Sequence, residues 1–76
     1  MPRPVYQITR DIERDWSKPS PYALPYIKAM RQITTIHDSY GYDSARGIVL
    51  YFLSNAASWR GPDARRIKQE LKTLLR

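Results

Sequence analysis

The chain has 76 residues, no cysteine and a formal net charge of +6. A domain of this size buries only about 60% of its unfolded surface, and without cysteine no disulfide or thiolate metal site can reinforce it. Its apolar content of 42% argues against disorder, and the longest apolar run, Ile48 to Leu53, is too short to span a bilayer. We therefore expect one soluble, cytoplasmic domain, residues 1–76, with no membrane partner. Self-assembly stays open as a further source of stability.

The first predicted helix follows residue 4 and carries one apolar face. Val5, Ile8, Ile12 and Trp16 recur at helical spacing, and charged residues of both signs lie between them. The mixed signs are typical of a solvated face with local ion pairs. The segment PVYQIT would also suit a short extended start, because a proline precedes residues that favour strands.

The second predicted helix is long and follows a connection that contains three prolines. Pro25 suits its first turn, where the missing N–H costs least. The apolar arc then continues as far as Tyr40, and Gly41 is expected to end the helix. His37 lies in this arc, so we expect it to be a packed or rim residue rather than a catalyst. The arc consists of Tyr26, Ile27, Met30, Ile33, Ile36, His37 and Tyr40.

The third and fourth predicted helices follow in quick succession. Asp43 is the expected N-cap of SARGIVLYFLSNAA, which is apolar around more than half of its circumference and should be central. Pro62 and Asp63 start the last helix, which runs to about Leu75. Its apolar stripe is Ala64, Ile67, Leu71, Leu74 and Leu75. We predict an all-α domain of four helices, two of them long, with the third packed by the second and fourth and with Trp16 and Trp59 as satellites.

Residues suited to catalysis are scarce. A single histidine and no cysteine leave none of the usual nucleophile–base pairs. The seven acids show no metal-loop spacing, and the three glycines form no phosphate loop. The sequence therefore predicts a protein that is not an enzyme and that uses no cofactor, metal ion or small-molecule substrate.

The last nineteen residues, 58–76, concentrate the positive charge, with six basic and two acidic residues. On a helical wheel, four basic residues of the last helix fall within about 80° with no acid among them. Arg66 lies on the other flank, where Asp63 and Glu70 can pair with it. Arg60 and Trp59 precede the helix, and an arginine beside an exposed aromatic suits phosphates and bases. We call the following residues the basic strip: Arg60, Arg65, Lys68, Lys72 and Arg76.

Nucleic-acid binding, to DNA or RNA, is the leading hypothesis for the basic strip. The short break between the third and fourth helices has the length that a helix-turn-helix uses. We expect Lys68 and Lys72 to point away from the apolar stripe, so that changing both to Glu would abolish binding and leave the fold intact.

An acidic protein is the alternative partner, because the same electrostatics would attract it. Tyrosine favours interfaces, and the chain has more tyrosines than a small core needs. YGYD would display Tyr40 and Tyr42 at a helix junction. In the alternative interpretation, the tyrosine rings pack and only their hydroxyls face water.

The segment DSYGYDSARGIVLYFLSNAASWRGPDARRIKQELKTLL, residues 38–75, resembles short hypothetical proteins of phage and prophage genomes. The likeness rests on YFLSNA, SWRG and ARRIKQEL in this order. No established activity is known for such proteins, so the resemblance assigns no functional residue. It implies a small binding module for nucleic acid or for an acidic host protein, and it does not choose between them.

Overall fold

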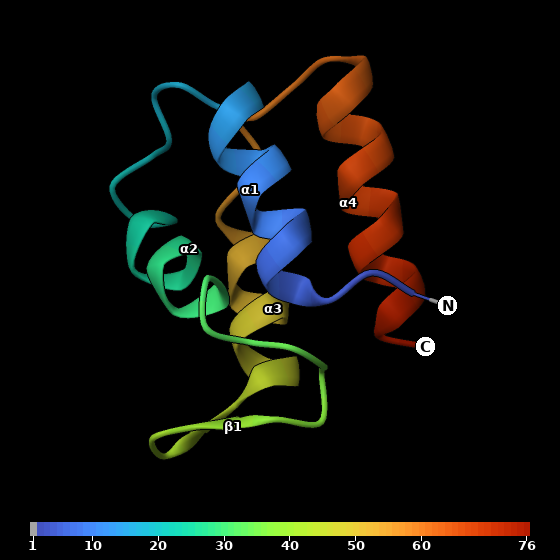
Figure 1. The fold of residues 1–76 in the computed structure, drawn as a ribbon. Helices are drawn as coiled ribbons and strands as arrows, with labels where there is room; N and C mark the ends of the chain where they lie inside the picture. Colours follow the sequence, from blue (N-terminus) through green and yellow to red (C-terminus); the bar gives the residue numbers. More distant parts are fainter. Residues whose placement is uncertain (1) are drawn as a thin grey trace.

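The computed structural model describes residues 2–76, apart from the side chain of Tyr40. Helices make up more than half of this part of the chain, and strands very little (Figure 1). The helices are α1 (Val5–Asp15), α2 (Leu24–Met30), α3 (Ala45–Ser54) and α4 (Pro62–Leu74). Two short strands, β1 (Ser39–Tyr40) and β2 (Asp43–Ser44), pair antiparallel. The predicted all-α class is confirmed. Within residues 2–76, no helix is long and apolar enough to cross a membrane.

Helix α1 has the buried face that its apolar spacing predicts. Val5, Ile8, Ile12 and Trp16 are all buried. The helix begins at Val5, so the extended start is not formed. Its first N–H groups would lack partners within the helix. The N–H of Val5 donates to the Thr34 carbonyl at 3.0 Å, and that of Tyr6 donates to the Ile33 carbonyl at 2.8 Å.

Helix α2 is much shorter than predicted, because it ends at Met30 rather than near Tyr40. The residues that follow include a β-branched run, 33–36, which loses side-chain freedom in a helix. The Asp38 carboxylate accepts hydrogen bonds from the Thr34 and Thr35 N–H groups at 2.8 and 3.2 Å. Such side-chain bonds compete with helical ones. The carbonyls of Ile33 and Thr34 instead accept hydrogen bonds from the first N–H groups of α1.

A small hairpin takes the place of the end of the predicted second helix. Gly41 lies in its turn at φ +62°, a conformation that favours glycine, and does not cap a helix. The hairpin leads directly into α3. The N-cap of α3 is Ser44 and not Asp43, since the Ser44 hydroxyl accepts from the Gly47 N–H at 3.0 Å.

The core is built around three aromatic side chains. Trp16 and Trp59 stack with ring centroids 5.6 Å apart, and Phe52 of α3 lies edge-on to them at 6.3 and 6.2 Å. Both tryptophans are buried, so they are central rather than satellites. Helix α2 packs on α3 as predicted, but α4 lies mainly alongside α1 (Figure 1). The predicted stripe of α4 is buried, with Leu74 half-buried at its edge.

Candidate nucleic-acid interface

The connection between α3 and α4 spans residues 55–61. It is longer than the turn of three or four residues that a helix-turn-helix uses, so its length does not support that motif. The connection carries Trp59 into the core and ends at Gly61, which has φ +115°. Helix α4 then starts with Pro62 and runs for 13 residues. Its length is about 20 Å at 1.5 Å per residue.

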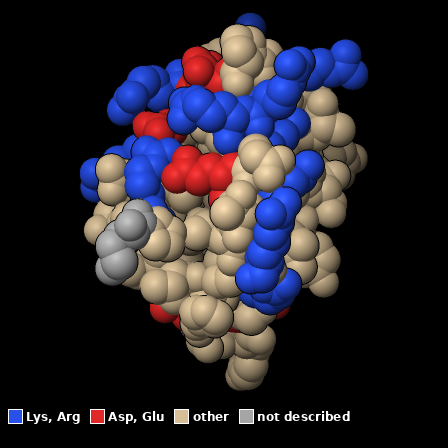
Figure 2. Space-filling model, turned by 90° about the vertical axis from the view of Figure 1, so that its right-hand side faces the viewer, with Lys and Arg blue, Asp and Glu red and all other residues tan. Residues whose placement is uncertain are grey.

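Four of the five residues of the basic strip are exposed along α4 and its ends: Arg60, Arg65, Lys72 and Arg76. Among the described residues, none of these four lies within ion-pairing distance of an acid. Figure 2 shows Lys and Arg atoms over this face, continuing down one side as a narrow column. In the same view, most Asp and Glu atoms lie to the left of this column, among the basic residues of the upper part. The sequence predicted this separation of charge from helical spacing alone.

Lys68, the fifth residue of the strip, has a structural role that the sequence did not reveal. Its Nζ donates hydrogen bonds of 2.7 Å to the carbonyls of Ala56 and Trp59 and lies 5.7 Å from the centroid of the Trp59 ring. It thereby ties α4 to the connection after α3. Partial burial lowers the pKa of Lys68, and the positive charges of Lys72 and Arg60 lower it further. The premise that Lys68 points away from the packed surface is therefore wrong, and we now expect Lys68→Glu to destabilise the fold.

Trp59 is not the exposed stacking platform that the sequence suggested. Its side chain is 2% exposed, and its Nε1–H donates to the Asp15 carboxylate at 2.7 Å. A ring held in this way cannot stack on a base without leaving the core. Arg60 remains beside it at the surface, where Arg60, Arg65 and Lys68 line a shallow hollow of about 240 Å³.

The other flank of α4 is neutralised, as predicted, although by a different partner. The Arg66 guanidinium nitrogen lies 3.7 Å from an Asp63 carboxylate oxygen. Both side chains are largely exposed, so this ion pair contributes little to the free energy of unfolding. Glu70 does not pair with Arg66. It accepts hydrogen bonds of 2.9 and 2.7 Å from Arg3, which also bonds Asp11 at 2.7 Å. These bonds lower the pKa of Glu70 and of Asp11 and raise the pKa of Arg3.

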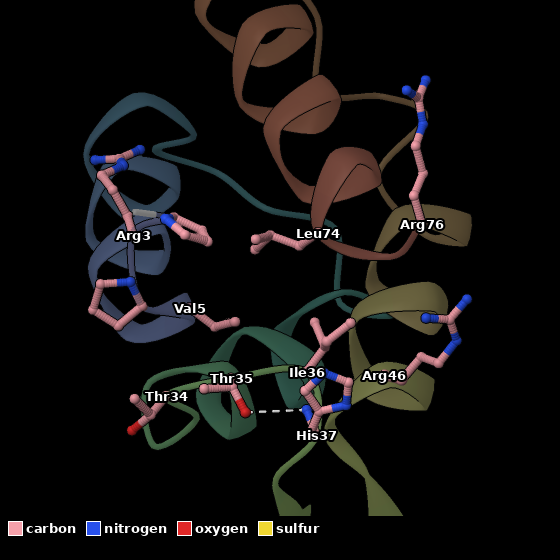
Figure 3. A pocket seen from close by; sticks show the side chains of 11 residues that line it. Arg3, Val5, Thr34, Thr35, Ile36, His37, Arg46, Leu74 and Arg76 are labelled. Carbon is pink, nitrogen blue, oxygen red and sulfur yellow. Dashed lines mark hydrogen bonds between the residues drawn. The ribbon is translucent and has the colours of Figure 1, made fainter.

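Arg46 of α3 is a residue that the sequence analysis missed. It is exposed, has no ion pair in the described chain, and lines a hollow of about 430 Å³ together with Arg76. In Figure 3 both arginines stand on one side of this hollow. No sequence signal predicted that Arg46 and Arg76 would line the same hollow, because the two residues are thirty positions apart. Arg46 extends the basic strip beyond the end of α4.

Tyr42, the remaining predicted site residue, lies outside the basic strip, as do the other exposed tyrosines and His37. Tyr42 is fully exposed at the hairpin, while Tyr22 and Tyr51 are 76% and 56% exposed. His37 is exposed on the loop before β1 and not packed in a helix. Over residues 2–76, histidine and the acids form no group of three that could hold a metal ion.

No family model, curated protein or solved structure gives a significant match to this chain. The geometry of its surface is therefore the basis for assigning a function.

Proposed function

We propose that the protein is a non-enzymatic binding protein that holds nucleic acid by its phosphate backbone. The observation that supports this proposal is the row of unpaired cations along α4, formed by Arg60, Arg65, Lys72 and Arg76. At one phosphate per 3.4 Å of a strand, a surface about 20 Å long faces about six phosphates. Since Trp59 is buried, it cannot stack on a base, and the expected binding through the phosphates is weak and independent of sequence.

Salt dependence provides the quantitative test of this proposal. Four phosphate contacts on duplex DNA give a slope of log K against log salt of about −3.6, which is a loss of about 150-fold between 50 and 200 mM. The purified protein would be titrated with random duplex DNA, single-stranded DNA and RNA at both salt concentrations. Failure to bind any of the three at the lower salt would refute the proposal.

A pair of double variants separates the strip from net charge alone. Arg65→Glu with Lys72→Glu should remove two contacts and reduce the slope to about −1.8. Lys18→Glu with Lys28→Glu changes the net charge equally at exposed positions that lie outside α4 and have no ion pair in the described chain. This control should keep the slope of the unmodified protein. Equal losses in the two variants would mean that total charge, and not the strip, governs binding.

A protein partner is the second candidate, and exposed aromatic residues favour it. Tyr42, Tyr22 and Tyr51 all present most of their surface to solvent, and such residues are enriched in protein interfaces. An acidic host protein is one of the two partner classes that the phage-type resemblance allows. Saturable binding to one acidic protein, with no binding to random nucleic acid, would favour this function over the first.

A further inference from the structure

Two apolar hollows flank the end of the basic strip. The first, which we call the α1–α4 hollow, is the one of about 430 Å³ that Arg46 and Arg76 line. In Figure 3, Val5 and Leu74 point toward one another across it, and Ile36 lies below Leu74. The second, the α3–α4 groove, has about 420 Å³ and is lined by Leu50, Leu53, Ser54, Lys72, Leu75 and Arg76. Arg76 belongs to both hollows and so stands between them.

The charged residues that line these two hollows are all basic. Within the described chain, no acid lines either of them. Arg3 also borders the α1–α4 hollow, but Asp11 and Glu70 already occupy its guanidinium. The charges of Arg46, Lys72 and Arg76 are therefore available to a ligand. Apolar walls with a few charged groups at the rim are typical of binding sites.

Arg46 is placed where the fold does not favour it. It is the second residue of α3, at the end of the helix where the macrodipole disfavours a cation by about 0.3–1 kcal/mol. Among the described residues, no acid lies within ion-pairing distance of Arg46. The neighbouring surface of α3 also carries Leu50, which is 46% exposed. These placements suit a surface that a partner covers.

We propose that the α1–α4 hollow and the α3–α4 groove together bind a short acidic peptide segment of a partner protein. One apolar side chain enters each hollow, and the carboxylates between them contact Arg46 and Arg76. A phosphate backbone has no apolar side chains to fill these hollows, so the inference goes beyond the proposed nucleic-acid function. The proposed peptide site and the proposed nucleic-acid site share Lys72 and Arg76, whereas Arg60 and Arg65 belong to the nucleic-acid site alone.

Three synthetic peptides test both parts of this recognition. The probe is acetyl-Ser-Leu-Glu-Asp-Phe-Ser-amide. One control replaces its acids with Gln and Asn, and the other replaces Leu and Phe with Ser. Methyl resonances of the labelled protein should shift at Leu50, Leu53 and Leu74 when the probe is added. Each control should bind at least about 10-fold more weakly, which corresponds to about 1.4 kcal/mol.

Single variants locate the peptide site and separate it from the nucleic-acid site. Arg46→Gln should weaken probe binding by about 10-fold while the protein remains at least as stable, since it removes a cation from a helix N-terminus. Arg65→Glu should weaken duplex DNA binding and leave probe binding unchanged. If Arg65→Glu weakens DNA binding but the unmodified protein does not bind the probe, the peptide proposal has failed and the nucleic-acid proposal stands.

Three results would overturn the inference: no binding of the probe at millimolar concentration, equal binding of the peptide that lacks Leu and Phe, or shifts confined to the surroundings of Arg60 and Arg65. A further contrary result would be shifts of the same three leucines on addition of duplex DNA alone, because the hollows would then belong to the nucleic-acid site.

Discussion

Replacement of Lys68 by methionine should destabilise the protein, although a wheel places Lys68 among surface cations. Methionine keeps an unbranched side chain beside Trp59 but removes the ammonium. The carbonyls of Ala56 and Trp59 then lose donors that lie at 2.7 Å. A hydrogen bond from a charged group contributes about 1.5–3 kcal/mol when buried. Because water can replace part of each bond at this half-buried position, we expect a total loss of about 2 kcal/mol.

Thermal unfolding followed by far-ultraviolet circular dichroism measures this loss. For a domain of this size, 2 kcal/mol lowers Tm by about 8–16 °C. Lys72→Met is the matched control, because Lys72 lies one turn away on the same helix, is exposed and makes no hydrogen bond in the described chain. It should change stability by no more than about 0.5 kcal/mol. Equal melting temperatures for the two variants would refute the proposed role of Lys68.

Three further changes test the core, a glycine with positive φ and the acidic network. Phe52→Ala should cost about 3–5 kcal/mol in urea unfolding, and Leu53→Ala should cost less because Leu53 is only partly buried. Gly61→Ala should cost about 2 kcal/mol in the same assay, since φ is +115° at Gly61. The lowered pKa of Glu70 means that its pairing with Arg3 stabilises the fold above the unfolded value of about 4.3 and is lost as pH falls through the lower folded value. Stability measured between pH 7 and 2 should therefore decline less steeply in Arg3→Met than in the unmodified protein.

The helices that the sequence predicted correctly are those in which one local pattern decides the outcome. The buried faces of α1 and α4 follow from apolar spacing, and the start of α4 follows from Pro62. The same spacing failed after Met30. It correctly marked Ile33 for burial, but it did not reveal that Asp38 captures the local N–H groups. Apolar periodicity predicts which side chains are buried, whereas side-chain-to-backbone bonds decide whether the backbone is helical.

The candidate site shows the same division between local and distant causes. The exposed cations of α4 were predictable, because spacing within one helix places them together. The contributions of Arg3 and Arg46 were not, since each depends on a contact with a residue far away in the chain. Trp59 was misassigned for a related reason. Only the fold brings Asp15 to its indole N–H and so removes the ring from the surface.

Most acidic side chains bind groups elsewhere in the fold, and this explains why the net charge of +6 is concentrated on one face of the protein. Six of the seven acids bind a group within the described chain: Asp11, Glu13, Asp15, Asp38, Asp63 and Glu70. Their negative charge is therefore fixed near α1, the loop after α2 and one flank of α4. The cations left over include a row along the opposite flank of α4, which Arg46 extends. Repulsion within such a row is unfavourable in the isolated protein, and a polyanion or an acidic peptide would relieve it.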